Sequence, residues 1–176
     1  MTKLLFTCNA CGLKNEIGLD DGKCRACFTI AFMRADRPIS GHSAEWHFFR
    51  SYIGTALATT PNETNADGEF LDSNADISDL APETLESTLA DCAAFYAANS
   101  EHIHCDGAPL SREFEGSIAA REAAMAGHDF WLTRCGHGAG FWDGDWPEPA
   151  ASELDKAANI FGNVDLYIGD DGQIYA

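Results

Sequence analysis

Four cysteines near the N-terminus constrain the fold of this chain more than any other feature. They form two Cys-x2-Cys pairs separated by twelve residues: Cys8, Cys11, Cys24 and Cys27. Each pair can direct two thiolates at one ion, and two pairs complete the tetrahedral four-sulfur shell of a structural zinc site. Such a shell leaves no open position for catalysis. The pattern predicts one structural zinc ion (Zn2+) held by residues 1–34.

The segment that carries these cysteines, CNACGLKNEIGLDDGKCRAC, resembles a zinc ribbon or zinc knuckle. The resemblance implies a small metal-folded module that contacts nucleic acid or a protein. Two disulfide bonds, a redox site or an iron–sulfur site are the alternatives. The chain has seven cysteines, an odd number that argues against a fully paired disulfide framework. Residues 35–42, with a proline and a glycine, indicate a linker to a second unit, residues 43–176.

Acidic residues dominate the second unit and limit its partners. The net charge of the chain is −17. Residues 1–50 carry seven Lys/Arg and five Asp/Glu (+2), whereas residues 51–176 carry four and twenty-three (−19). No Lys or Arg occurs in the 61 residues from Ser51 to Ser111. Because phosphate contacts need cations, this composition disfavours direct binding of nucleic acid by the second unit.

The carboxylates of this stretch are a candidate surface for a host protein with a basic face. A dense set of carboxylates can imitate the phosphate backbone of DNA and occupy the basic groove of a nuclease, with fast, salt-dependent association. The alternative is a solvated acidic face without a partner. The candidate partner-binding residues are Glu63, Asp67, Glu69, Asp72, Asp76, Asp79, Glu83, Glu86 and Asp91.

Apolar spacing and turn residues predict an α+β fold for residues 43–176. The start and stop signals include Ser43 and Ser111 as helix N-caps, Pro82 in a first turn and Gly127 as a stop. The predicted helices span residues 44–58, 111–126 and 152–161, and a further helix starts near Asp79 or Pro82 and ends near Ser100. The predicted antiparallel sheet has about four strands, over residues 128–134, 140–143, 164–168 and 173–175, the last two joined by a tight Asp-Asp-Gly turn.

The densest set of candidate catalytic residues lies in the His128–Asp143 region. Cys135 and His137 could act as nucleophile and base, with Asp143 orienting the histidine, as in a small hydrolase or transferase. A second interpretation takes the histidines and aspartates of this region as ligands of another metal ion. Neither interpretation has a diagnostic spacing.

A structural interpretation of the same region is favoured. A glycine-rich turn would join two aromatic strands, with Trp131 and Trp142 as cross-strand core residues. We therefore expect a binding function rather than an enzymatic one.

Two segments of the C-terminal half resemble a group of small acidic, largely uncharacterised proteins encoded by bacteriophages and mobile elements. They are GHDFWLTRCGHGAGFWD (127–143) and VDLYIGDDGQIY (164–175). The group brings no established activity, so the resemblance implies a phage or plasmid setting rather than a mechanism.

Together, the acidic stretch and the resemblance favour an accessory protein that binds a host protein, such as an anti-restriction or anti-CRISPR-like inhibitor. The alternatives are a zinc-ribbon adaptor in transcription or DNA processing, and a small hydrolase that uses the His128–Asp143 region. No apolar run approaches the ~18–20 residues of a membrane span, and the N-terminal apolar run is too short for a signal peptide. We expect a cytoplasmic protein with no membrane partner.

Overall fold

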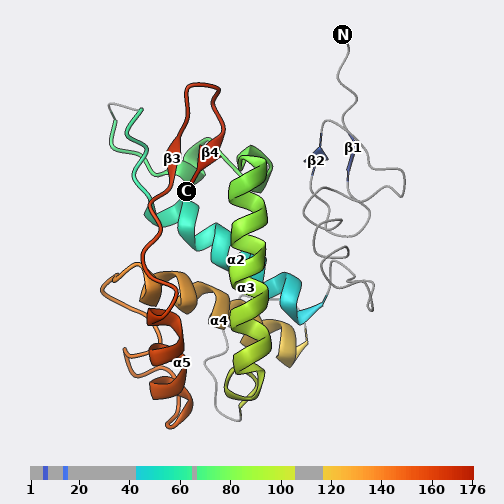
Figure 1. Ribbon diagram of the computed structural model, residues 1–176, viewed down its shortest axis with the longest axis vertical. Coiled ribbons are helices and arrows are strands. Elements are labelled where there is room, and N and C mark those ends of the chain that lie inside the picture. The colour runs from blue at the N-terminus through green and yellow to red at the C-terminus, as the bar shows by residue number, and fades with distance from the viewer. Residues whose placement is uncertain (1–5, 8–13, 16–42, 65–66, 106–116) are drawn as a thin grey trace.

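The computed structural model describes residues 6–7, 14–15, 43–64, 67–105 and 117–176 (Figure 1). Its helices are α2 (Ala44–Thr59), α3 (Pro82–Ile103), α4 (Ile118–Arg134) and α5 (Ala150–Asn159), with two 3-10 turns, η1 (Leu71–Ser73) and η2 (Ile77–Asp79), between α2 and α3. The strands are β1 (Phe6–Thr7), β2 (Lys14–Asn15), β3 (Tyr167–Ile168) and β4 (Ile174–Tyr175). The predicted α+β class is confirmed.

The four cysteines predicted to bind zinc, Cys8, Cys11, Cys24 and Cys27, lie outside the described residues. The two short strands β1 and β2 pair antiparallel, with Phe6 opposite Asn15 and Thr7 opposite Lys14. The zinc site and the division into units 1–34 and 43–176 therefore stay predictions.

The first two predicted helices form where local signals placed them. The side chain of Ser43 accepts a hydrogen bond from Trp46 N at 3.2 Å, as an N-cap does. Pro82 stands at the start of α3, where its missing N–H costs nothing. Both helices run slightly further than predicted, to Thr59 and Ile103.

The predicted strand over residues 128–134 is wrong, because these residues form the last two turns of α4. Ser117 caps this helix and accepts from Ala120 N at 3.2 Å, whereas the predicted cap, Ser111, lies outside the described residues. The predicted stop, Gly127, lies inside the helix. A Cβ atom there would sit 2.0 Å from Phe48 O in α2, so this glycine permits the close crossing of α2 and α4.

The helix ends at Arg134, eight residues later than predicted, and Gly136 follows its C-cap residue, Cys135. This glycine has φ +68°, and its N–H binds Thr133 O at 3.1 Å, while His137 N binds Leu132 O at 2.9 Å. These two bonds are those of a Schellman C-cap, which needs a left-handed residue at this point. The predicted strand over residues 140–143 is also wrong, since the chain turns there and Trp142 is 57% exposed.

The predicted four-stranded sheet is reduced, within the described C-terminal half, to the hairpin of β3 and β4. Tyr167 lies opposite Tyr175 and Ile168 opposite Ile174, and Gly172 adopts φ +79° in the predicted turn. The hairpin is fastened to the start of α3, because Ala81 N donates to Ile174 O at 2.8 Å. The short helix α5 begins at Ala150 rather than at Ser152.

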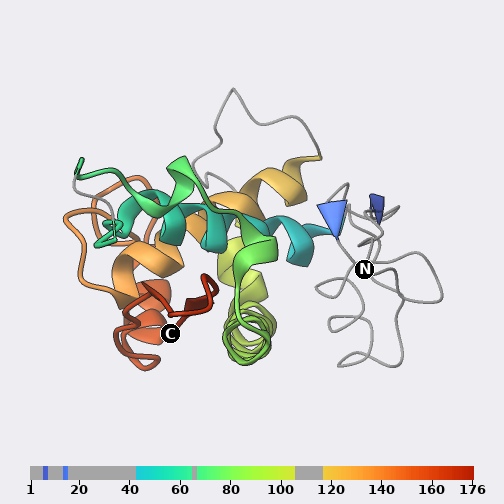
Figure 2. The same ribbon diagram turned by 90° about the horizontal axis from the view of Figure 1, so that it is seen from above.

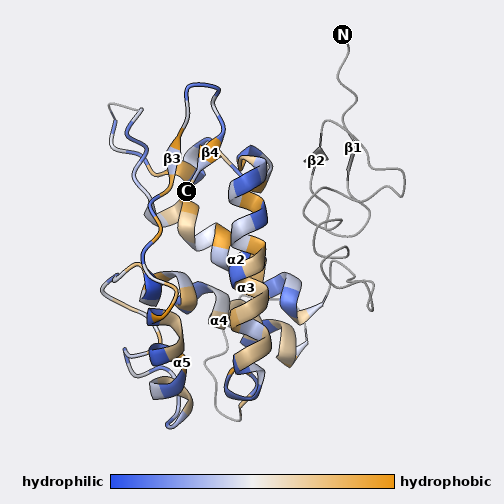
Figure 3. Ribbon diagram, in the orientation of Figure 1, coloured by the Kyte–Doolittle hydropathy of each residue, from blue (hydrophilic) through white to orange (hydrophobic). Residues whose placement is uncertain are grey.

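An aromatic core joins the helices. The rings of Phe95 (α3) and Phe130 (α4) stack with centroids 4.1 Å apart, and Phe130 meets Phe161 edge-on at 5.1 Å. Figure 2 looks nearly along α3 and shows α2 and α4 running side by side. Hydrophilic residues follow the loop between α2 and α3 and the hairpin turn (Figure 3). None of the helices in the described segments has both the length and the apolar composition to cross a bilayer.

Candidate functional site

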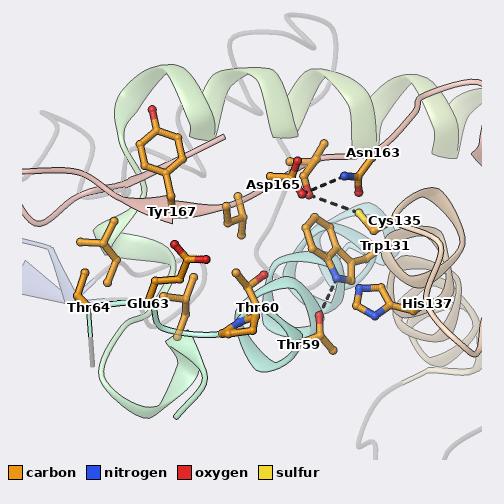
Figure 4. Close-up of a pocket in the computed structure, with 15 residues that line it drawn as sticks. Thr59, Thr60, Glu63, Thr64, Trp131, Cys135, His137, Asn163, Asp165 and Tyr167 are labelled. Atoms are coloured by element: carbon orange, nitrogen blue, oxygen red, sulfur yellow. Dashed lines mark hydrogen bonds between the residues drawn. The ribbon is translucent and has the colours of Figure 1, made fainter. Parts of the chain in front are cut away.

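A cavity of about 750 Å³ opens between the end of α2, the end of α4 and the segment that leads into β3 (Figure 4). Its walls come from residues 59–64 on one side and residues 163–168 on the other, with Trp131, Cys135 and His137 of α4 and its C-cap at one end. Trp131 is only 2% exposed, and its indole Nε1 donates to Thr59 Oγ1 at 2.8 Å. The volume is that of a small-molecule or side-chain binding site.

Two of the three candidate catalytic residues, Cys135 and His137, line this cavity. The Schellman cap brings them there, because it turns the chain back beside the last turn of α4. The Cys135 thiol contacts Val164 O at 3.7 Å, the geometry of a weak S–H hydrogen bond. Burial raises the pKa of this thiol, which keeps it protonated. A nucleophilic cysteine needs the opposite shift.

The third candidate, Asp143, does not line the cavity. Its carboxylate accepts from Gly140 N and Asp145 N, each at 3.3 Å, and so fixes the turn that follows α4. The ring of His137 packs beside Trp131, with centroids 6.4 Å apart. In the part of the chain that the structure describes, no hydrogen bond joins Cys135 to His137. The three residues are therefore not assembled into a nucleophile–base–orienter arrangement.

The other members of the His128–Asp143 region have structural partners. His128 Nδ1 lies 2.8 Å from Asp129 Oδ1, and Trp146 Nε1 donates to the buried Asp129 Oδ2 at 2.6 Å. Among residues 43–64, 67–105 and 117–176, no group of three or more His, Cys, Asp or Glu side chains is placed to hold a metal ion. The interpretation of this region as a second metal site gains no support.

The candidate partner-binding carboxylates differ in their surroundings. Asp91 forms an ion pair with the buried Arg134 at 3.0 Å and so helps to hold the core. Asp76 and Asp79 form the capping box of η2. The remaining six are exposed: Glu63, Asp67, Glu69, Asp72, Glu83 and Glu86.

A second cation-free stretch joins the first at one end of the molecule. Residues 157–176 contain no Lys or Arg, and their hairpin packs beside residues 80–81 and across the cavity from residues 59–64. We call this region the acidic end. Its carboxylates are those of Glu63, Asp67, Glu69, Asp72, Asp76, Asp79, Glu83, Asp165, Asp170 and Asp171.

Sequence reasoning missed the contribution of Asp165, Asp170 and Asp171, although the absence of cations after Lys156 was a readable signal. It also missed the cavity, whose walls are about 100 residues apart in the chain. Comparison with protein-family models, curated proteins and solved structures gave no match to this chain.

Proposed function

We propose that this protein is an accessory factor that binds a basic protein partner through its acidic end. The observation that carries the proposal is the meeting of two stretches without Lys or Arg, residues 51–111 and 157–176, at one end of the helical core. A partner that handles nucleic acid fits this surface, since its groove is built to receive a row of negative charges. Such binding would block access of DNA or RNA to that groove.

The positions of the cations support this proposal. Within residues 43–64, 67–105 and 117–176, the Lys and Arg residues are Arg50, Arg121, Arg134 and Lys156. Arg134 is buried, and Lys156 binds Glu153 on α5 at 2.9 Å. All four belong to α2, α4 and α5 rather than to the segments of the acidic end. Among the described residues, the charged side chains in the segments of the acidic end are therefore carboxylates.

The resemblance of residues 127–143 and 164–175 to proteins of bacteriophages and mobile elements supports a particular setting. An element that enters a host gains from inhibiting a restriction nuclease or a CRISPR effector, and both have basic nucleic-acid grooves. We include this inhibitory role in the proposal.

The test is a capture experiment with the full chain immobilised in bacterial lysate, at salt of roughly 0.1 M and of 1 M, where the Debye length falls from about 10 Å to 3 Å. We expect the chain to capture a basic nucleic-acid-handling protein at low salt and to lose it at high salt. Its purified form should then bind the chain and lose nuclease activity.

Charge variants locate the contact. Asp72→Asn/Glu83→Gln/Asp170→Asn removes three exposed carboxylates of the acidic end. Glu101→Gln/Asp145→Asn/Glu148→Gln removes three exposed carboxylates elsewhere. We expect the first triple variant to weaken the partner's affinity by roughly tenfold, or 1.4 kcal/mol, and the second to change it far less. Equal effects of the two variants, or capture that persists in high salt, would overturn the proposal.

A further inference from the structure

The threonine hydroxyl groups in one wall of the cavity already donate their protons to hydrogen bonds within the protein. Thr59 Oγ1 donates to Thr55 O at 2.8 Å, and Thr60 Oγ1 donates to Ala56 O at 2.7 Å. Thr64 Oγ1 donates to Asn62 Oδ1 at 2.7 Å. A hydroxyl has one proton and two lone pairs, so these threonines offer a ligand acceptors rather than donors.

Three other side chains of the cavity lining, those of Trp131, Cys135 and Asn163, also have a donor bound within the protein. The indole N–H of Trp131 is bound to Thr59 Oγ1, and the Cys135 thiol faces Val164 O. The amide of Asn163 donates to Asp165 Oδ1 at 2.9 Å. Figure 4 shows the hydroxyl of Tyr167 pointing away from Glu63. The ligand that suits such walls is a donor of several hydrogen bonds.

The charged side chains that line the cavity are carboxylates. Glu63 and Asp165, both exposed, belong to opposite walls, and Figure 4 shows Glu63 reaching into the space between them. Among the described residues that line the cavity, none is a Lys or Arg. Apolar and aromatic side chains, including Leu71, Trp131 and Tyr167, complete the walls. The cavity thus combines two carboxylates, lone-pair acceptors and ring faces.

We propose that this cavity binds a guanidinium group, the side chain of an arginine on the basic partner. A guanidinium ion carries five N–H donors in a plane, pairs with carboxylates through two parallel hydrogen bonds and stacks on aromatic rings. Its alkyl stem matches the apolar walls. An ammonium ion is more strongly hydrated and satisfies fewer of the acceptors, so the lining favours the guanidinium group over a lysine.

The position of the cavity favours a protein-borne arginine as its source. The opening lies within the acidic end, so a partner seated on that surface would bring an arginine to it. This inference rests on the proposed function, since it assigns one residue of the same partner to one site. A free guanidine compound has the same chemistry and is the competing source.

The experiment titrates the full chain with Nα-acetyl-arginine methylamide and follows the indole 1H–15N resonance of Trp131 by NMR. The matched probe is Nα-acetyl-citrulline methylamide, which keeps the shape and removes the charge. We expect the arginine probe to shift this resonance and the citrulline probe to bind at least about tenfold more weakly. Equal binding of the two, or no shift with either, would overturn the proposal.

Two double variants with the same change in net charge locate the site. Glu63→Gln/Asp165→Asn removes both carboxylates of the cavity, whereas Glu86→Gln/Asp170→Asn removes two exposed carboxylates outside its lining. We expect the first to weaken the arginine probe by about tenfold or more and the second by less than about twofold. Similar losses in both would show a general charge effect and overturn the site.

Two further measurements distinguish a protein-borne arginine from a free guanidine compound, and the cavity inference from the proposed function. Agmatine binding tenfold or more tighter than the arginine probe would overturn the protein-borne source in favour of a free compound. A captured basic partner can then be tested against both sets of variants. If it binds Glu63→Gln/Asp165→Asn as tightly as the wild type but binds the triple variant of the acidic end more weakly, the proposed function stands and the cavity inference fails. If the cavity double variant loses more affinity for the partner than its charge-matched control does, the result supports both the proposed function and the cavity inference.

Discussion

Arg134 shows how the surroundings of a single residue change its interpretation. It lies in a segment dense with histidine, cysteine and aspartate, yet it is only 6% exposed and its hydrogen bonds connect buried parts of the core. Its Nη1 binds Tyr52 Oη at 2.9 Å and Asp91 Oδ2 at 3.0 Å. Its Nε and Nη2 bind the carbonyls of Gly162 and Phe161, just beyond α5. One side chain of α4 therefore links α2, α3 and the segment that follows α5.

We predict that Arg134→Met lowers the free energy of unfolding by roughly 3–5 kcal/mol, because a buried ion pair that loses one partner leaves polar groups uncompensated. Asp91 can rehydrate, since its side chain is 39% exposed, but Tyr52 and the two carbonyls are left without this donor. Urea unfolding followed by circular dichroism measures the change. The control, Arg50→Met on the exposed face of α2, should stay within about 0.5 kcal/mol. A loss below about 1 kcal/mol for Arg134→Met would contradict this account.

At the scale of secondary-structure elements, two glycines within helices provide a matched test of how closely α2 and α4 cross. Gly127 of α4 has no room for a methyl group, whereas Gly54 of α2 has no heavy atom within 4 Å of a built Cβ. We predict that Gly127→Ala destabilises the fold by about 1–3 kcal/mol or more, because the obstacle is backbone. Gly54→Ala should stabilise it by roughly 0.5–1 kcal/mol through helix propensity. Thermal unfolding of both variants checks the signs, and two stabilising changes would refute the close crossing.

The elements that could be predicted from sequence are those with local signals. Ser43 and Pro82 mark helix starts by their own chemistry, and the Asp-Asp-Gly turn fixes a hairpin through one left-handed glycine. The last turns of α4 were harder to predict, because they are buried all round and Phe130 and Trp131 are typical of strands. Gly127 and Gly136 look alike in sequence, yet one permits packing and the other ends the helix.

The candidate site belongs to the scale of the whole molecule and was harder to predict. The cavity needs Glu63 and Asp165 on facing walls. Tertiary contacts, among them those of the hairpin with residues 80–81 and of Cys135 with Val164, bring these distant segments together. The sequence shows each cation-free stretch but not their meeting. Like charges gathered at one end oppose folding by mutual repulsion. The aromatic core and Arg134 supply the offsetting stabilisation without contributing to that surface.

The zinc prediction also belongs to the whole chain, and metal analysis of the purified protein tests it. We expect close to one zinc ion per chain, lost in Cys24→Ser and retained in Cys135→Ser, since a four-thiolate shell fails without any one ligand. Among the described residues, the buried core cluster runs from Trp46 to Ile174. The helical circular dichroism of α2–α5 should therefore persist in Cys24→Ser and after chelation, while residues 1–34 become sensitive to protease. Loss of the helical signal on chelation would show that the two units fold as one, and a metal content near zero with all four cysteines in disulfides would refute the zinc site.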